Sequence, residues 1–325
     1  MCTGHGEVAQ MGKMIEDISR DLMMPIDDLR YLASTAPYRY KVYEIPKRNP
    51  NERRVIAQPA RELKRVQGWI VKNVLSRYPI HPCAVAYQRG KSIFHNAAPH
   101  ARGNYLLKMD FEEFFHSIKG ADMRRMLADR SPGVFETDDI GSLERLLFWR
   151  PMRGGNLVLS IGAPSSPYLS NLMMLEFDER VSDYCKTLGV AYTRYADDLT
   201  FSAHEKRLLG RVEAEVHRIC RELPYPRLRL NRDKRVHASR ATSRRVTGLT
   251  LSNDGLVSIG RERKRELRAA VHHFVHGKLN EEQQKSLAGK LAFVHSVERK
   301  ALQSLADRYG PETIAQILRK NRPPG

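Results

Sequence analysis

The chain has 325 residues, 41% of them hydrophobic, which is enough for a folded protein of two or three subdomains and excludes a disordered tail. Lys and Arg number 55 against 37 Asp and Glu, and the formal net charge of +18 points to a polyanionic partner such as nucleic acid. No apolar run approaches the length of a membrane-spanning helix, so we expect no membrane partner.

Cysteine usage and the N-terminal residues predict a cytoplasmic protein. The four cysteines lie far apart, without the paired spacing of a zinc site or a disulfide scaffold. The opening stretch MCTGHGEVAQMGKMIEDISR lacks the basic-then-apolar order of a signal peptide. Both observations fit a reducing cytosol.

The first half of the chain predicts helices around one strand pair. Residues 1–40 are expected to be helical, because MIEDISRDLMMPIDDLRYLAS carries apolar residues at helical spacing. YKVYEIPKRNPNERRVIAQP predicts two strands joined by the polar turn KRNPNE, and ARELKRVQGWIVKNVLSRY predicts an amphipathic helix. GNYLLKMDFEEFF begins as a strand and ends as a turn or short helix, and residues 121–150 are mainly helical.

The second half predicts a strand hairpin followed by a basic helical module. In GVAYTRYADDLTFSA the strands cover residues 190–195 and 199–203, with residues 196–198 at or near the turn. RVTGLTLSNDGLVSIG predicts short strands around an Asn-Asp-Gly turn. RERKRELRAAVHHFVHG predicts a helix that ends near Gly277, and more helix follows to about Lys320. The apolar face of that helix is predicted to consist of Leu267, Val271, Phe274 and Val275.

Two adjacent carboxylates, Asp197 and Asp198, stand at the predicted hairpin turn. Aspartate favours turns through local hydrogen bonds, but apolar and aromatic neighbours place this pair on a half-buried surface, where like charges need a compensating cation. Asp110 ends another apolar strand, LLKMD. Three such carboxylates can hold two Mg²⁺ ions roughly 3.5–4 Å apart, one to activate a hydroxyl and one to neutralise a leaving phosphate. The basic composition makes nucleic acid the expected substrate.

Four motifs in a fixed order resemble one known family. YADD after a strand, with DFEEFF upstream, resembles the palm of reverse transcriptases. NAAPH (residues 96–100) and VTG (residues 246–248) resemble two hallmarks of retron reverse transcriptases. GAPSSPYLSN (residues 162–171) resembles the Gly-x-x-x-Ser-Pro segment of the polymerase family. The resemblance covers residues 38–260, and by it the chain is identified as a member of the retron reverse transcriptases.

This resemblance implies an α+β fold of the right-hand polymerase type, with fingers, an antiparallel palm sheet with helices, and a helical thumb. Residues 1–40 would be an N-terminal helical extension, and 41–105 would form the fingers together with a helical insertion at 119–158. Residues 106–118 and 159–245 would form the palm. Residues 246–325 would form a primer-grip hairpin and a basic helical thumb. We expect no RNase H or integrase domain.

The resemblance also implies roles for residues around the carboxylates. The implied catalytic residues and metal ligands are Asp110, Asp197 and Asp198. Phe115 stands where the family has a steric gate that selects deoxynucleotides. A core position is the alternative, since Phe111, Phe114 and Phe115 cannot all face the substrate.

Basic residues are implied to contact the phosphates of the incoming nucleotide. The finger residues are Lys47 and Arg54, with Arg48 and Arg53 as adjacent alternatives. Lys234 corresponds to a lysine near the leaving pyrophosphate, and a solvated lysine is the alternative.

The Gly162 segment is implied to approach the primer–template closely, and Ser166 and Pro167 complete that motif. Ser160 and Ile161 replace the usual Pro-Gln before this glycine. The Ile161 side chain cannot form the hydrogen bonds of the usual Gln, so the resemblance leaves the exact nucleotide contact open while the metal chemistry is unaffected.

RNA contacts are implied for two further groups. Asn96 and His100 serve either the RNA or a local structural bond, and no second His or Cys at ligand spacing supports His100 as a metal ligand. The second group consists of Val246, Thr247, Gly248, Arg261, Arg263, Lys264 and Arg265. From residue 226 to 325, Lys and Arg number 22 against 9 Asp and Glu, which favours phosphate contacts over the alternative of a solvated helical surface.

The implied activity is RNA-directed synthesis of single-stranded DNA from dNTPs. A cognate structured noncoding RNA would serve as template and, through the 2′-OH of an internal guanosine, as primer. Host RNase H would remove the template, and an effector protein would act with the enzyme in antiphage defence. The alternatives are another bacterial reverse transcriptase, of the group II intron or abortive-infection type, and a non-catalytic RNA-binding scaffold with a polymerase fold.

Overall fold

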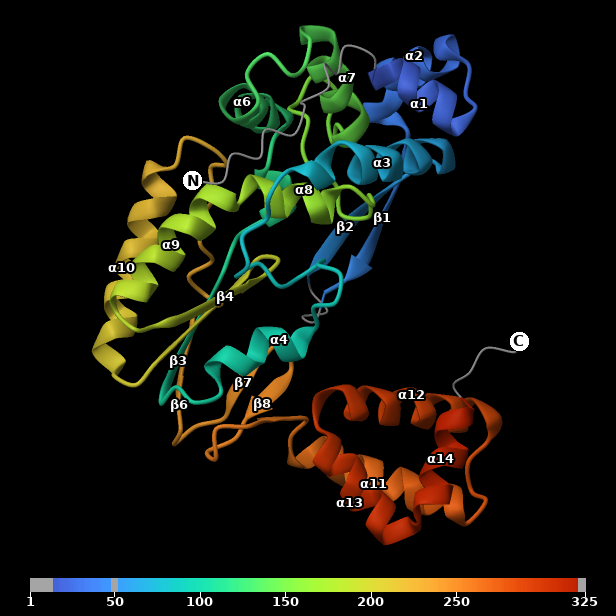
Figure 1. Ribbon diagram of the computed structural model, residues 1–325, viewed down its shortest axis with the longest axis vertical. Coiled ribbons are helices and arrows are strands. Elements are labelled where there is room, and N and C mark those ends of the chain that lie inside the picture. The colour runs from blue at the N-terminus through green and yellow to red at the C-terminus, as the bar shows by residue number, and fades with distance from the viewer. Residues whose placement is uncertain (1–13, 48–51, 321–325) are drawn as a thin grey trace, which may run out of the picture.

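The computed structural model describes residues 14–47 and 52–320 and has a mixed α+β architecture arranged along one long axis (Figure 1). A four-stranded sheet lies in the middle. Helices from the first half of the chain form one end, and a C-terminal helical bundle forms the other. The α+β class expected from the sequence is confirmed.

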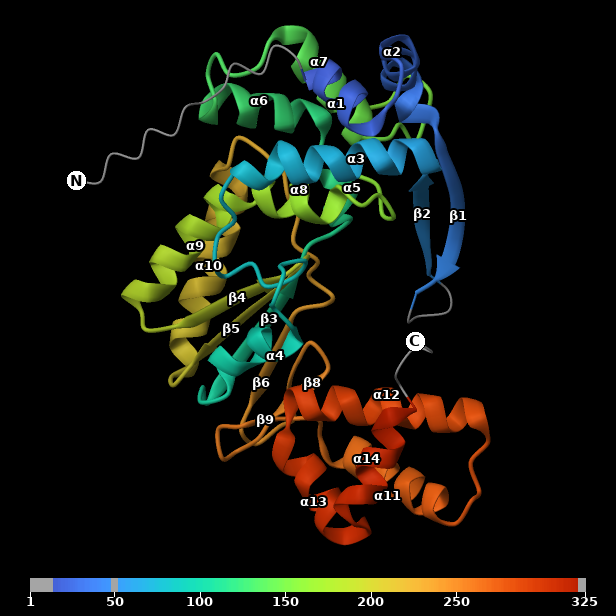
Figure 2. The ribbon, with the colours of Figure 1, turned by 45° about the vertical axis from the view of Figure 1, so that its right-hand side comes forward.

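The N-terminal end is a layer of amphipathic helices. Its elements are α1 (Met14–Leu22), α2 (Ile26–Thr35), α3 (Arg61–Asn73), α6 (Gly120–Arg130) and α7 (Thr137–Leu147), with the 3-10 turns η1 (Ala36–Tyr38) and η2 (Leu75–Arg77). A hairpin of β1 (Tyr40–Pro46) and β2 (Arg53–Pro59) projects from this layer towards the C-terminal bundle (Figure 2). The helices and strands expected here are confirmed, but residues 1–13 and residues 48–51 of the predicted KRNPNE turn lie outside the described residues.

The central sheet has the order β4-β5-β3-β6 and is antiparallel throughout. Its strands are β3 (Tyr105–Asp110), β4 (Ala191–Tyr195), β5 (Asp198–Ala203) and β6 (Val236–Ser239). The hairpin of β4 and β5 matches its prediction. Strand β6 was not expected, because it is short and half exposed and is held by pairing with β3.

Helices cover one face of the central sheet and share the main hydrophobic core with it. They are α8 (Ser166–Met173), α9 (Leu175–Thr187) and α10 (Lys206–Glu222), and the short α5 (Phe114–Ser117) follows β3. Phe177 of α9 and Val216 of α10 are fully buried together with Leu107 and Phe201 of the sheet. Burial of this apolar face fixes the register of the strands, and therefore the position of the residues at their ends.

A second hydrophobic core joins the C-terminal bundle to the edge of the central region. It contains residues of α4 (Ile93–Ala97), η3 (Ala98–His100), β7 (Arg244–Val246), β8 (Leu249–Leu251), β9 (Val257–Ser258), α11 (Arg261–Val275), α12 (Glu281–Val297), α13 (Arg299–Tyr309) and α14 (Pro311–Arg319). On α11 the predicted face is correct for Leu267 and Val271, which are buried, but wrong for Val275, which is 51% exposed at the last turn. Within the described ranges, no helix is both long and apolar enough to span a bilayer.

Candidate active site

Strand pairing brings two of the three aspartates face to face. Asp110 is the last residue of β3, Asp198 is the first residue of β5, and the two are register partners. Asp197 precedes Asp198 in the turn, and its carbonyl accepts a hydrogen bond from the Phe111 amide at 3.3 Å. Side chains directly opposite each other on antiparallel strands lie about 4.5–5.5 Å apart at Cβ, so this register forces like charges together.

Burial and repulsion shape the titration of these carboxyl groups. Burial raises the pKa of Asp198 to about 6; the charge of Lys108 opposes this shift, and the neighbouring Asp197 and Asp110 add to it. Burial also raises the pKa of Asp197, and the charge of Asp110 raises it further. An arrangement that holds anions together against such a cost requires positive charge close by.

Two cations reach the carboxylates from distant parts of the chain. Lys234 Nζ forms an ion pair with Asp110 Oδ1 at 2.9 Å, although the lysine side chain is half exposed. The positive charges of Lys234 and Arg54 both act to lower the pKa of Asp197, against the larger effect of burial. The lysine is therefore at the site and is not merely solvated.

The two basic residues predicted for the fingers, Arg54 and Lys47, make different contacts. Arg54 on β2 lies within electrostatic reach of Asp197, whereas Lys47 pairs with Glu52, Nζ to Oε2, at 3.3 Å across the end of the same hairpin. Successive side chains on a strand point to opposite faces, so Arg53 is directed away from the face that Arg54 uses. Arg48 lies outside the described residues.

The donor set suits a hard divalent cation. Among residues 14–47 and 52–320, no three His, Cys, Asp or Glu side chains are already arranged as a metal-binding group. Asp110 is instead engaged by Lys234, and its proximity helps to raise the pKa of Asp198. Three carboxylates nevertheless lie at adjoining strand ends, and two of them keep raised pKa values despite the nearby cations. Such a group of oxygen ligands favours Mg²⁺ or a similar ion.

Three phenylalanines follow Asp110, and burial distinguishes them. Phe111 and Phe114 are 2% and 3% exposed and stack with ring centroids 5.7 Å apart in the main core. Phe115 packs against that core but keeps part of its surface accessible. Of the three, Phe115 is the ring that remains available to a substrate.

The Gly162 loop is attached to the β1–β2 hairpin. The Ala57 amide of β2 donates to the Ile161 carbonyl at 2.9 Å. Gly162 has φ +125°, and a Cβ there would lie 3.0 Å from the Ala57 oxygen, so glycine is required for this packing. The close approach seen at Gly162 is thus to the chain itself. Ser166, at the start of α8, is buried and its hydroxyl has no hydrogen-bond partner among the described residues.

The NAAPH segment is structural in this conformation. His100 is fully buried, with its ring nitrogens 2.9 Å from Ser202 Oγ and 2.8 Å from Thr193 Oγ1. Burial lowers its pKa to about 3, so the ring is neutral. Asn96 is also fully buried, and its amide donates to Thr247 Oγ1 at 3.5 Å. The assignment of Asn96 and His100 to RNA contact is therefore corrected to the local structural bonds that were its alternative.

The VTG segment forms the turn between β7 and β8 and packs on the NAAPH helix. Thr247 and Gly248 have φ of +44° and +80°, as a tight hairpin turn requires. Val246 is fully buried in the second core. Only Thr247 and Gly248 retain surface that an RNA could reach.

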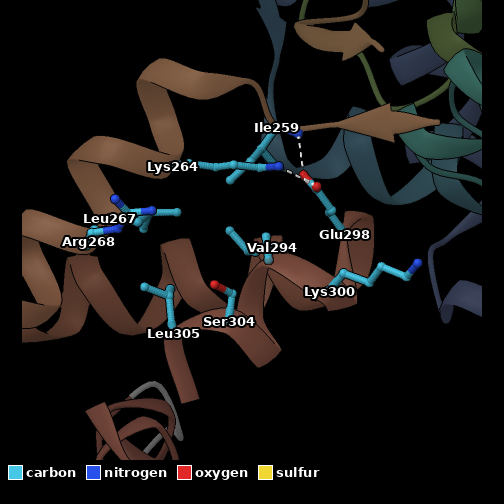
Figure 3. A pocket seen from close by; sticks show the side chains of 10 residues that line it. Ile259, Lys264, Leu267, Arg268, Val294, Glu298, Lys300, Ser304 and Leu305 are labelled. Atoms are coloured by element: carbon cyan, nitrogen blue, oxygen red, sulfur yellow. Dashed lines mark hydrogen bonds and ion pairs between the residues drawn. The ribbon is translucent and has the colours of Figure 1, made fainter. Parts of the chain in front are cut away.

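The basic residues at the start of α11 differ in exposure: the arginines face solvent, whereas the lysine is partly buried. Arg261, Arg263 and Arg265 are exposed, and Arg263 also donates to the Gly248 carbonyl at 3.1 Å. Lys264 instead pairs with Glu298, Nζ to Oε1, at 2.6 Å, and Figure 3 shows this pair at the edge of a cavity of about 170 Å³ between α11 and α13. Its ammonium is therefore engaged within the protein, which argues against the RNA contact predicted for Lys264.

Sequence reasoning missed two features beside the catalytic turn. Tyr87 has φ +63°; burial raises the pKa of its phenol and the charge of Asp197 raises it further, which places it near that carboxylate. Arg194, in the middle of a hydrophobic strand, is fully buried against Asp178. A charged residue directly before YADD in an otherwise apolar strand was the signal that could have revealed it.

A family match gives the class of protein to which this sheet and its carboxylates belong. Residues 45–251 match the family described as reverse transcriptase (RNA-dependent DNA polymerase). The chain is therefore an RNA-directed DNA polymerase, with the right-hand fold of fingers, palm and helical thumb. Enzymes of this family use divalent metal ions and an RNA template.

Comparison with individual relatives shows to which group of reverse transcriptases the chain belongs. The chain is 38% identical to the retron Ec83 reverse transcriptase of Escherichia coli over 93% of its own length and 97% of that protein. It is 35% identical to the retron Ec86 reverse transcriptase of Escherichia coli, over 92% of each. The chain belongs to the retron reverse transcriptases. Its structure is also similar to a telomerase from Candida albicans in complex with a telomeric RNA fragment, with 13% identity and a TM-score of 0.42, over 86% of this chain and 62% of that one.

Proposed function

We propose that this enzyme copies part of a cognate structured noncoding RNA into single-stranded DNA, and that synthesis starts from the 2′-OH of an internal guanosine of that RNA. The observation that carries the chemistry is the register pairing of Asp110 with Asp198, beside Asp197 and Lys234. Similarity to retron reverse transcriptases over most of the chain supports the choice of RNA and primer.

In this proposal Asp110, Asp197 and Asp198 hold two Mg²⁺ ions. When bound, such ions would activate the primer hydroxyl and neutralise charge on the transferring phosphate. The primer oxygen forms a bond to the α-phosphorus of a dNTP, and the bond to pyrophosphate breaks. Arg54 and Lys234 stabilise the negative charge of the triphosphate and of the departing pyrophosphate, while Lys47 orders the hairpin that carries Arg54.

Other residues are proposed to select and align substrates. Phe115 excludes the ribose 2′-OH of a ribonucleotide. Gly162 and Ser166 shape the nucleotide and primer–template surface through the loop attached to β2. Thr247, Gly248, Arg261, Arg263 and Arg265 form the RNA surface at the start of the thumb.

The proposed subdomains keep the bounds expected from the sequence. Residues 1–40 are an N-terminal helical extension, and the fingers comprise 41–105 and 119–158. Residues 106–118 and 159–245 form the palm, and the primer grip and thumb begin at 246. We further propose that host RNase H removes the copied template and that the DNA–RNA product acts with an effector protein in antiphage defence.

Expression together with the DNA immediately upstream of the gene tests the proposal. The purified enzyme should carry a short single-stranded DNA joined to RNA through a 2′,5′ branch. Ribonuclease should trim the RNA but leave the branch nucleotide, and a debranching enzyme should release it. DNA that begins at an ordinary RNA 3′ end, or active enzyme without DNA, would refute the proposed priming while leaving polymerase activity intact.

A further inference from the structure

A fully buried ion pair lies next to the catalytic turn. Arg194 on β4 and Asp178 on α9 have no exposed side-chain surface. Arg194 donates to Asp178 Oδ2 at 2.6 Å through Nη2 and to Oδ1 at 2.9 Å through Nε. The Tyr192 hydroxyl adds a third donor to the carboxylate at 2.8 Å. The charges are therefore paired and hydrogen-bonded, as buried charges require.

The same guanidinium also reaches the turn itself. Arg194 Nη1 donates to the Ala196 carbonyl at 3.0 Å and to Asn171 Oδ1 at 3.1 Å. Ala196 has φ +58°, in the left-handed region that residues with a Cβ rarely adopt. The hydrogen bond to its carbonyl holds the peptide that joins Ala196 to Asp197, and so opposes relaxation of the turn.

Neighbouring elements hold Arg194 from its other sides. Its backbone amide donates to the Cys83 carbonyl at 2.8 Å, and its carbonyl accepts from the Val85 amide at 2.8 Å. Asn171 Nδ2 donates to the Ala86 carbonyl at 2.9 Å, so the second partner of the guanidinium is itself fixed. The arginine is thus a rigid connection from α8, α9 and the loop at 83–86 to the turn.

Fold stability alone does not explain this choice of residues. Apolar side chains of similar volume often replace a buried ion pair with no loss of stability. Two nitrogens of one planar group, Nε and Nη2, bind the Asp178 carboxylate, while the third, Nη1, binds the turn, an arrangement that lysine cannot reproduce. We propose that Arg194 is a positioning residue that sets the orientation of the Asp197 carboxylate for catalysis. The proposal rests on the metal-binding role proposed above for Asp197 and Asp198; Arg194 itself touches no substrate.

Two variants test the proposal in the full-length enzyme by primer extension on an RNA template. Arg194→Lys keeps the positive charge opposite Asp178 but loses the planar guanidinium that bonds Asp178 and the turn together. Arg194→Gln combined with Asp178→Asn removes both charges at once. A misplacement of about 1 Å at a reacting group can cost about 10²-fold in rate. We expect kcat to fall 10- to 100-fold and the half-saturating Mg²⁺ concentration to rise at least threefold, as order-of-magnitude effects of that misplacement. The affinity for RNA and the KM for dNTP should stay unchanged.

A rescue and a control separate positioning from folding. Ala196→Gly in the Arg194→Lys background should recover about fivefold in kcat, because glycine adopts a positive φ without the penalty of a Cβ. Arg180→Lys makes the same substitution on α9 at a surface ion pair with Glu222 and should leave kcat unchanged. Thermal unfolding is measured for every variant.

The outcomes distinguish this proposal from the function on which it rests. Wild-type kcat and Mg²⁺ dependence in a folded Arg194→Lys or double variant would overturn the positioning role. Unfolding of both variants would also overturn it, since the pair would then be a folding requirement. Asp197→Asn serves as the reference: if that variant retained activity, the metal-binding assignment itself would fail.

Discussion

Lys234 Nζ lies 2.9 Å from Asp110 Oδ1, and 124 residues of sequence separate the two. The contact exists because the segment before β6 is bound to the end of β3: the Asn231 amide donates to the Asp110 carbonyl at 2.7 Å. A cation is thereby held beside a group of three carboxylates. Because the Lys234 side chain is half exposed, its ammonium can follow the negative charge of a departing pyrophosphate.

Replacing Lys234 by Met should lower kcat about 10²-fold, the usual cost of removing one stabilising donor. The apparent KM for dNTP should change much less, because the charge develops on the leaving group during reaction. Single-turnover primer extension measures this effect. Arg232→Met, at an exposed position two residues earlier, is the control and should behave like the wild type. Equal rates for the two variants would make Lys234 a surface residue without a role in the reaction.

The raised pKa of Asp198 predicts a pH-dependent stability of the metal-free enzyme. The folded-state pKa of about 6 lies above the ordinary value of 3.8, so the stabilising contribution is fully present below pH 3.8 and is lost as the pH rises through 6. Asp198→Asn should therefore stabilise the metal-free protein above pH 6, by about 1–3 kcal/mol at roughly 1.4 kcal/mol per pKa unit. Denaturant unfolding with chelator at pH 5 and pH 7.5 measures the difference. A variant that gains the same stability at both pH values would show that Asp198 does not titrate in this range.

Phe115→Ala should increase ribonucleotide incorporation by at least tenfold relative to deoxynucleotide, because the proposed clash with the 2′-OH disappears; a steric penalty of about 1.4 kcal/mol corresponds to that factor. Primer extension with paired dNTP and rNTP concentrations gives the ratio of kcat/KM values. Phe115→Tyr keeps the ring and is the matched control. Unchanged selectivity in Phe115→Ala would place the gate at another residue and leave Phe115 as part of the core surface.

Substitutions at the start of α11 should change RNA affinity and protein stability independently of each other. Arg261→Gln, Arg263→Gln and Arg265→Gln together should weaken RNA binding and reduce the slope of log K against log salt by about 0.7–0.9 for each RNA phosphate that is no longer neutralised. Lys264→Gln should leave that slope unchanged and lower the unfolding temperature, because it breaks the ion pair with Glu298. Filter binding across a salt series, together with thermal unfolding, tests both statements. If the triple variant kept the wild-type slope, this face of α11 would be only a solvated surface.

The local patterns of the sequence predict the strand ends that carry the aspartates. Alternating or continuous apolar runs bounded by turn residues identify β3, β4 and β5, and their register follows from burial of one face. The position of Asp110 opposite Asp198 was therefore within reach of sequence reasoning. The short, half-exposed β6 had no comparable pattern, because its place depends on long-range pairing with β3.

Residue roles that depend on distant contacts could not be obtained in this way. Nothing local indicates that His100 is enclosed between Thr193 and Ser202, or that Lys264 meets Glu298. The motif NAAPH was recognisable, but its burial against the Thr247 turn depends on a contact across 151 residues. Burial distinguishes a residue that reaches a ligand from one that holds the fold together, and burial is a property of the assembled layers.

The central claim is that Asp197 and its two partners form one metal-dependent site of DNA synthesis. The most direct test is primer extension on an RNA template across a Mg²⁺ series, with wild-type enzyme and Asp197→Asn compared at equal RNA occupancy. The substitution keeps the shape of the side chain and removes one metal-binding charge. We expect the wild type to require Mg²⁺, and we expect Asp197→Asn to fold, bind RNA and synthesise no DNA at any Mg²⁺ concentration. Extension by Asp197→Asn at a near wild-type rate would contradict the account.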